Sequence, residues 1–306
     1  MATRSLASVF VLGTALLAAL ICIWLAATAS LPDTRTFLIA SVFAVLMAAA
    51  TARQIHFGFR SNVDLTTLLI LAMVLSFEPE VAVLAAAAGA LAGHVIQRIP
   101  LNGVMFNSGQ VVLQAAAGAG VLAVSGWNPS EPAYDDLRYL PVILLVMVTV
   151  FAVNTALVAA VIGLQARIAP WLIWREAVTT DFLIEQASQF ALGLVTAIVI
   201  YVQIWLLPVL MAPGLMLYVS ASRKSRLEFQ TVEAIDALAD LVDARDPYTA
   251  DHSRRVALLA RELATAINMS PGDIEAVERA ARVHDLGKLV IDLAVLNKDE
   301  PLNDQE

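Results

Sequence analysis

Four side chains near the C-terminal end of the sequence have types and a spacing that suit metal-dependent chemistry. They are His252, the adjacent His284 and Asp285, and Lys288, one helical turn beyond His284. Imidazole and carboxylate groups together suit divalent iron, manganese, zinc or nickel, and a carboxylate can bridge two ions. Two ions about 3.5–4 Å apart can activate water and stabilise the charge of a phosphoryl displacement. Lys288 is placed to meet an anionic group of a substrate.

Two predicted helices bring the histidines together. The first is expected to start after Thr249 as N-cap, and its stripe of apolar side chains includes His252, which should point inward. The second is expected to start at Ser270, with Pro271 and Asp273 completing a near capping box, and to end near Leu286 and Gly287. The stripe of the first helix consists of Val256, Leu259, Leu263 and Ile267, and the inner face of the second of Ile274, Val277, Ala281 and His284. From spacing alone, a metal site and a pair of hydrogen-bonded core histidines both remain open.

Residues 244–256 and 280–288 resemble the opening half of an HD-GYP domain, a branch of the HD metal-dependent phosphohydrolases that typically degrades cyclic di-GMP. Asn297-Lys298 and Pro301-Leu302 also resemble a segment of that family, so the resemblance covers about residues 232–306. It implies that His252, His284 and Asp285 are ligands of two divalent ions, with Asp285 as the bridge. It also implies that Lys288 contacts phosphate, and that water held between the metals gives the linear dinucleotide or GMP.

The sequence departs from that family after Asp285. The family uses further histidines, an aspartate and a glycine-tyrosine-proline segment, but only 21 residues follow Asp285 and none is histidine. Three ligands do not complete a two-metal site. We therefore expect a fragment of a longer protein rather than a natural truncation, and we expect the chain by itself to be inactive.

The composition indicates that a membrane region precedes this domain in the chain. Of 306 residues, 59% are hydrophobic and 15% charged, against about 45–50% and about 25% in soluble domains. Residues 228–306 carry seventeen acidic and eight basic side chains, whereas residues 1–227 are nearly neutral. This acidic balance argues against binding of DNA or RNA. The single cysteine, Cys22, excludes an intrachain disulfide.

Apolar runs predict about eight membrane spans, because a helix needs about 20 apolar residues to cross a bilayer. Glu78, Pro79 and Glu80 separate two short runs as a tight hairpin, and Pro208 and Pro213-Gly214 are expected to divide the last stretch. The first run is interpreted as a retained helix rather than a signal peptide. The runs are Leu6–Ala29, Thr36–Ala52, Val63–Phe77, Val81–Ile96, Val104–Ser125, Leu140–Leu164, Phe182–Val202 and Trp205–Ser220.

Basic residues give the expected orientation. With eight spans, nine basic residues fall on the side of the N-terminus and two, Arg35 and Arg138, on the other. This asymmetry predicts that both termini are cytoplasmic. The resemblance to the HD-GYP family implies that the membrane is the bacterial inner membrane. Gly89 and Gly93 suggest close helix packing. The polar residues of the spans have two interpretations. They form either a functional site, such as a ligand pocket or ion path, or interhelical hydrogen bonds, and the second is favoured. These residues are Asn107, Gln110, Gln114, Asn154, Glu185, Gln186 and Gln189.

The predicted organisation is all-α, a polytopic bundle followed by an incomplete cytoplasmic HD-type domain. Residues 1–222 form the membrane sensor or anchor, residues 223–243 a connecting signalling helix, and residues 244–306 the first part of the HD-GYP domain. The helix prediction for the connector rests on apolar residues at three- and four-residue steps, which are Phe229, Val232, Ile235, Leu238 and Val242. We expect the connector either to continue the last span as one rod or to be an ordinary first helix of the tail domain, and both can hold together.

The leading hypothesis is a membrane-bound signalling phosphodiesterase that hydrolyses cyclic di-GMP and forms a homodimer in the lipid bilayer. A non-enzymatic receptor or scaffold with a degenerate HD domain is the alternative from another class. An HD phosphohydrolase for another nucleotide or phosphoester, and a transporter with an accessory tail, are further alternatives.

Overall fold

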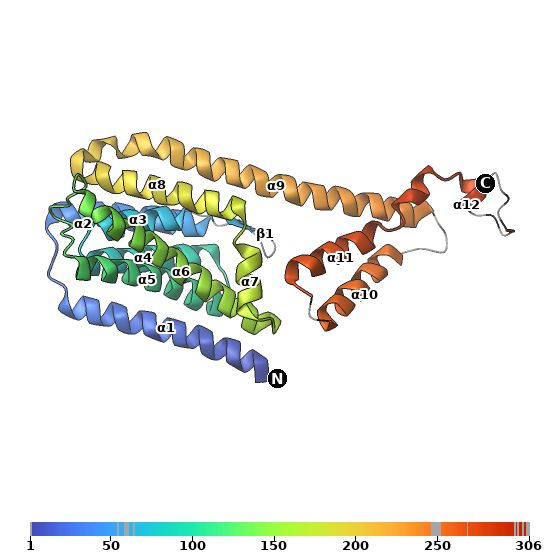
Figure 1. The fold of residues 1–306 in the computed structure, drawn as a ribbon, viewed down its shortest axis with the longest axis horizontal. Coiled ribbons are helices and arrows are strands. Elements are labelled where there is room, and N and C mark those ends of the chain that lie inside the picture. Colours follow the sequence, from blue (N-terminus) through green and yellow to red (C-terminus); the bar gives the residue numbers. More distant parts are fainter. Residues whose placement is uncertain are drawn as a thin grey trace. The chain divides into compact units, whose positions relative to one another are not determined.

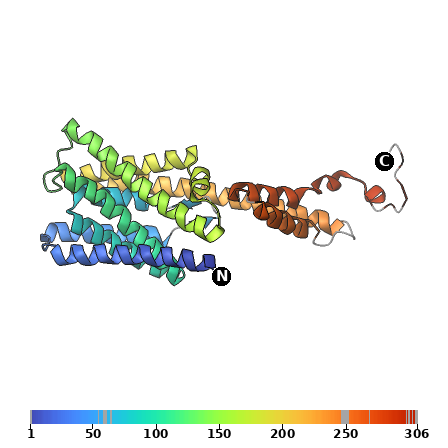
Figure 2. The same cartoon turned by 60° about the horizontal axis from the view of Figure 1, so that its bottom comes forward.

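The chain folds into two compact units, residues 1–222 and residues 223–306. The computed structural model describes residues 2–53, 55–57, 61–63, 65–245, 252–267, 269–296, 298, 300, 301 and 303. In these residues the fold is all-α apart from a short antiparallel hairpin of β1 (Ile55–Phe57) and β2 (Ser61–Val63), in which His56 pairs with Asn62. Figure 1 shows the helices in chain order, and Figure 2 shows the same ribbon from another side.

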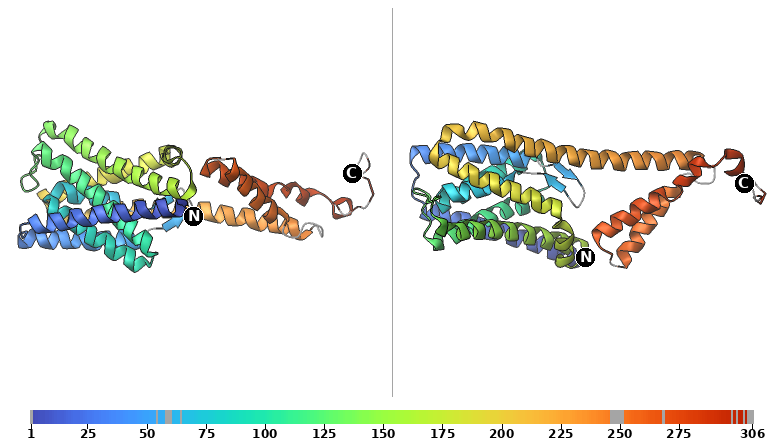
Figure 3. Two further views of the ribbon diagram at one scale, coloured as in Figure 1. Left: turned by 90° about the horizontal axis from the view of Figure 1, so that it is seen from below. Right: turned by 45° about the horizontal axis from the view of Figure 1, so that its top comes forward.

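The first unit is a helical bundle whose long apolar helices run alternately in opposite directions (Figures 1 and 3). Its helices are α1 (Ala2–Thr28), α2 (Thr34–Ala52), α3 (Thr66–Ser76), α4 (Pro79–Gln97), α5 (Leu101–Ser125), α6 (Leu140–Ala166), α7 (Pro170–Ala177) and α8 (Thr180–Val202). Short 3-10 helices η1 (Leu137–Tyr139) and η2 (Ile204–Leu206) precede α6 and α9 (Leu207–Arg245). Helix α9 begins in the first unit and ends in the second.

Six helices are long and apolar enough to cross a membrane within the described residues. They correspond to six of the eight predicted runs. The run at Val63–Phe77 forms only α3, whose 11 residues extend about 16 Å, roughly half of a bilayer core. Every residue from Thr66 to Leu75 is buried, so α3 is surrounded by other helices. The last run begins with a shorter apolar helix, Ile204–Met216.

The predicted break at Pro213-Gly214 is wrong. The chain leaves the helical conformation at Gln203, whose φ and ψ are −154° and 88°, and α9 then continues through Pro213. Pro208 lies in the first turn of α9, where a missing N–H is tolerated. The predicted turn between the third and fourth runs is confirmed, because α3 ends at Ser76 and α4 begins at Pro79.

Close packing of α2 against α4 confirms the prediction for the two glycines. A Cβ atom at Gly89 would overlap the carbonyl oxygen of Ala44, and one at Gly93 would overlap Thr51 Oγ1. Only glycine allows the backbones this near to one another. The surrounding core contains fully buried Phe43 and Met47 from α2 and the side chains of α3.

Among the polar residues of the bundle, one pair makes an interhelical hydrogen bond and another pair makes a contact within one helix. Gln110 Nε2 of α5 donates to the side-chain oxygen Oδ1 of Asn154 in α6. Within α8, Gln189 Nε2 lies 3.5 Å from Glu185 Oε1. Buried amides that bond one another satisfy polar groups in an apolar setting. These contacts favour the structural interpretation of Gln110 and Asn154.

Basic residues end several helices at the same end of the bundle. Arg53, Arg98 and Arg167 are the C-cap residues of α2, α4 and α6, which run in the same direction (Figure 1). Cations at helix C-termini interact favourably with the helix dipole. At the opposite end, Asp33 caps α2 and Asp136 pairs with Arg138.

The second unit consists of the later part of α9, α10 (His252–Ala266), α11 (Pro271–Val283), η3 (Leu286–Val290) and α12 (Leu293–Leu296). Helices α10 and α11 pack side by side as a hairpin (Figure 3). The predicted connector helix, residues 223–243, lies within α9. The predicted N-cap Thr249 lies outside the described residues.

Candidate metal centre

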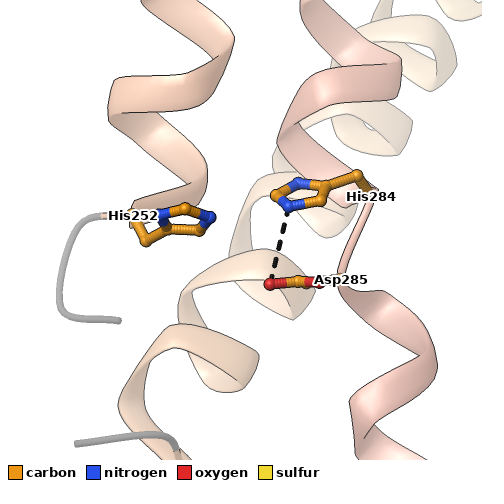
Figure 4. Close-up of side chains that lie close together, drawn as sticks. All are labelled: His252, His284 and Asp285. Atoms are coloured by element: carbon orange, nitrogen blue, oxygen red, sulfur yellow. Dashed lines mark ion pairs between the residues drawn. The ribbon is translucent and has the colours of Figure 1, made fainter. Parts of the chain in front are cut away.

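His252, His284 and Asp285 lie together where α10 begins and α11 ends (Figure 4). His252 is the first residue of α10, and His284 is the C-cap of α11. The centroids of the two imidazole rings are 5.4 Å apart. One nitrogen of each ring and one Asp285 oxygen all lie within 4.8 Å of one another. The structure therefore gathers the three predicted ligands into one cluster.

The local sequence explains how α11 delivers its two residues. Ser270 caps the helix, accepting from the Asp273 N–H at 3.2 Å and donating its hydroxyl to Asp273 Oδ2 at 2.7 Å. This confirms the predicted start at Ser270. The predicted end near Leu286 is three residues too late, because α11 stops at Val283 and η3 follows. His284 and Asp285 therefore lie in the turn between α11 and η3.

The orientation of His284 suits a ligand. Its Nδ1 lies 2.8 Å from the carbonyl oxygen of Ala281, and because a carbonyl only accepts, Nδ1 carries the hydrogen. A neutral imidazole held in this way has its other nitrogen available for a metal. His284 Nε2 lies 3.5 Å from Asp285 Oδ2. The backbone thus sets the tautomer that metal binding requires.

The geometry of the three donors fits a single divalent ion after a small adjustment. Ligands at about 2.1 Å from an ion are at most about 4.2 Å apart, against the 4.8 Å limit within which these donors lie. His284 is exposed, so rotation of its side chain can shorten the longer separations. Two imidazoles and one carboxylate suit divalent iron and its neighbours among the transition metals.

Lys288 lies against Asp285, with its Nζ 2.8 Å from Asp285 Oδ2. This hydrogen bond lowers the pKa of the Asp285 carboxyl below its usual range, with smaller contributions from the two nearby histidines. Asp285 is therefore ionised at neutral pH, the form that binds metal. The predicted contact of Lys288 with a phosphate stays a prediction.

The prediction that His252 shares a buried stripe on α10 is wrong. Leu259, Leu263 and Ile267 are all exposed, whereas α10 buries its smaller residues. Those buried residues are Ser253, Ala257 and Ala264. His252 is half-buried and His284 is exposed, so the two histidines meet at the surface of the described unit rather than in its core.

One group of charged residues beside the cluster was not predicted. The Arg282 guanidinium of α11 reaches Asp236 Oδ1 at 3.0 Å, Asp240 Oδ1, and Asp243 Oδ2 at 3.8 Å. The signal was present in the sequence, because aspartates at steps of four and three share one helical face.

A family model for the HD domain matches residues 249–305. Over 72 residues the chain is 40% identical to the 3'3'-cGAMP-specific phosphodiesterase 3 of Vibrio cholerae serotype O1, a match that covers 24% of this chain and 16% of the relative. Over 74 residues it is 34% identical to 3'3'-cGAMP-specific phosphodiesterase 2 of the same organism, covering 24% and 14%. The chain thus spans about one seventh of the length of these relatives. No solved structure matches the chain significantly.

Proposed function

We propose that the chain is the membrane-anchored part of a signalling phosphodiesterase, in which residues 244–306 begin a metal-dependent domain that hydrolyses a cyclic dinucleotide. The observation that carries this proposal is the gathering of His252, His284 and Asp285 within 4.8 Å, inside the segment that matches the HD domain. The names of the relatives support a cyclic dinucleotide as the class of substrate.

The residues of this chain have separate roles in the proposed site. His252 Nδ1 or Nε2, His284 Nε2 and one Asp285 oxygen would hold a divalent ion, and Asp285 would be the bridge to a second ion. When bound, the metal supplies a Lewis acid and lowers the pKa of bound water. Lys288, held 2.8 Å from Asp285, lies close enough to the ligands to contact a phosphate oxygen of the substrate.

The first experiment measures metal binding. The purified full chain in detergent micelles is titrated with Co²⁺ or Mn²⁺, and the His284→Ala and Asp285→Ala variants are expected to lose at least about tenfold in affinity. Arg261→Gln is the matched control, because Arg261 pairs with Glu278 elsewhere on α10 and α11. Binding that is unchanged in both variants would show that these residues are not ligands.

The second experiment measures hydrolysis by the protein encoded by the whole gene, because the chain spans only 16% and 14% of its relatives. Cyclic di-GMP and 3'3'-cGAMP are each supplied with Mn²⁺ or Fe²⁺. We expect hydrolysis of one or both, and its loss in Asp285→Ala. Metal binding without hydrolysis of either compound would favour a receptor or scaffold over an enzyme.

We also propose an orientation for the membrane region and a signalling role for the helix that follows it. Residues 1–222 cross the bacterial inner membrane with both termini in the cytoplasm, and residues 223–243 of α9 transmit a signal to a homodimeric output domain. The arginines that cap α2, α4 and α6 support this orientation, because basic residues favour the cytoplasmic side. Cysteines introduced at Glu131 and at Arg98, in a Cys22→Ser background, should react with a membrane-impermeant maleimide only at Glu131 in intact cells. Labelling of Arg98→Cys alone would invert the orientation.

A further inference from the structure

Arg282 is a buried cation surrounded by carboxylates of one helix face. Its side chain is 7% exposed, and its Nε donates to Asp236 Oδ1 at 3.0 Å. Its Nη2 donates to Asp240, and its Nη1 lies 3.8 Å from Asp243 Oδ2. The three aspartates follow one another along α9 at steps of four and three residues. The C-terminal end of α11 is therefore attached to α9 through a single guanidinium.

Two of these aspartates, Asp240 and Asp243, also contact the beginning of α10. Asp243 Oδ1 accepts from Ser253 Oγ at 2.6 Å, and Asp243 Oδ2 accepts from the Ser253 N–H at 3.2 Å. Arg254 Nη2 lies 3.5 Å from Asp240 Oδ2. Ser253 is 1% exposed and Asp243 is 7% exposed. We call Asp236, Asp240, Asp243, Ser253 and Arg282 the aspartate clamp.

The clamp is adjacent to the two histidines along the chain. Ser253 directly follows His252, and Arg282 precedes His284 by two residues. Because α10 begins at His252 and α11 ends at Val283, the clamp fixes the two helix ends from which the imidazoles project. Metal ligands must be held within about 0.5 Å of their working positions by surrounding contacts. Among the described residues of α9, Asp240 and Asp243 contact both helix ends.

We propose that the aspartate clamp positions His252 and His284 for binding of one divalent ion, with Asp243 and Arg282 as its central positioning residues. This inference rests on the proposed metal site. A buried ion pair is weak evidence for added stability, but losing one partner leaves a buried charge uncompensated. Removing either central residue therefore releases one helix end and separates the ligands.

The test compares clamp variants with a matched surface pair in the full chain. Asp243→Asn and Arg282→Lys are expected to weaken Co²⁺ binding by about 10–100-fold, the range typical of residues that orient metal ligands. Lysine keeps the charge but lacks the fork that contacts several carboxylates. Glu278→Gln is the control, because Glu278 joins α11 to α10 through Arg261 at 3.1 Å. It should change the affinity by less than about twofold.

A second measurement does not depend on metal. In a Cys22→Ser background, His252→Cys and His284→Cys are joined by a short bifunctional maleimide, and the rate of cross-linking reports the separation of the two helix ends. Adding Asp243→Asn should lower that rate at least fivefold at unchanged helical circular dichroism. An unchanged cross-linking rate would overturn the clamp, whatever the metal result. Efficient cross-linking of the His252→Cys, His284→Cys chain, together with no metal binding by the chain that keeps both histidines, would instead overturn the proposed function.

Discussion

The bundle of residues 1–222 packs glycine and apolar side chains against helix backbones, whereas the helices of residues 223–306 meet around charged groups. In the bundle, Gly93 sits against Thr51, and Met47 and Phe43 are fully buried. Among the described residues of the second unit, the buried apolar side chains are few and small. They are Ala239, Val242, Ala257 and Ala264. Arg282, Asp243 and Ser253 are buried among them.

This difference follows from what each region can use as a driving force. In an apolar surrounding, helices gain little by burying leucine, so close approach of small residues holds them together. In water, apolar burial drives packing, but α10 exposes its leucines. The second unit therefore depends more on a few polar contacts with defined geometry, and substitutions should act on the two units in different ways.

The largest expected effect is in the bundle, for Gly93→Leu. A side chain there would meet Thr51 and the carbonyl oxygen of Ala48, so α2 and α4 must separate, at a cost of about 3 kcal/mol or more. Thermal unfolding followed by size-exclusion chromatography in detergent should show loss of the folded species. Gly120→Ala is the control, because nothing lies within 4 Å of its Cβ. Equal behaviour of the two variants would refute close packing as the basis of this contact.

Arg282→Met should have the next largest effect, confined to the second unit. Methionine keeps the length but leaves Asp243 buried without its cation, which destabilises this unit by about 3 kcal/mol. Faster hydrogen–deuterium exchange is expected in α10 and α11 and not in the bundle. Arg279→Met is the control, since Arg279 is exposed and pairs with Glu275 one turn away. Uniform exchange over both units would contradict the comparison.

Acidification should act in opposite directions on the two units. Burial and the neighbouring Glu80 raise the pKa of Glu78 in the folded state. The contribution of Glu78 to the stability of the fold is therefore complete below its unfolded pKa of about 4.3, and it is lost as pH rises through the folded pKa. Lys288 lowers the pKa of Asp285, so that contribution is present above about pH 3.9 and is lost as pH falls through the folded pKa.

Hydrogen exchange near neutral pH and below about pH 4 measures both contributions. The region around Glu78 should become more protected in acid, and the region around Asp285 less protected. Glu78→Gln should remove the first change, and Lys288→Met should move the second to higher pH. Changes of the same sign in both regions would be the contrary result.

Arg261→Gln should have the smallest effect. Arg261 contacts Glu278 at 3.1 Å between α10 and α11, but its side chain is 55% exposed. Exposed ion pairs contribute about 0.2–1 kcal/mol. A shift in unfolding as large as that of Arg282→Met would mean that charge rather than burial governs the second unit.

Sequence periodicity and hydropathy were sufficient for most of the fold. Long apolar runs predicted the membrane helices, and Ser270 with Pro271 predicted the start of α11. The short α3 was overestimated because an apolar run looks the same whether lipid or other helices surround it. The break in the last stretch was misplaced at Pro213, because a proline inside a helix loses one hydrogen bond that neighbouring contacts can replace.

The candidate site was predicted in its residues but not in its surroundings. His252, His284 and Asp285 were identified from types, spacing and a family resemblance. Their exposure was not, because the leucines of α10 have helical spacing but face outward in the described unit. The spacing of the aspartates on α9 indicates a charged face, but the sequence does not show which arginine meets that face, so Arg282 was missed.

The row of aspartates on α9 has a consequence for the order of folding. Like charges one turn apart destabilise a helix by about 0.2–0.5 kcal/mol per pair, and carboxylates near a C-terminus oppose the helix dipole. Arg282, which offsets this repulsion, lies 39 residues after Asp243 in the chain. The last turns of α9 are therefore expected to become stable only after α11 has been synthesised and has docked. The C-terminal turns of α9 leave the ribosome before α11 does, and they would become fully helical only once α11 has docked.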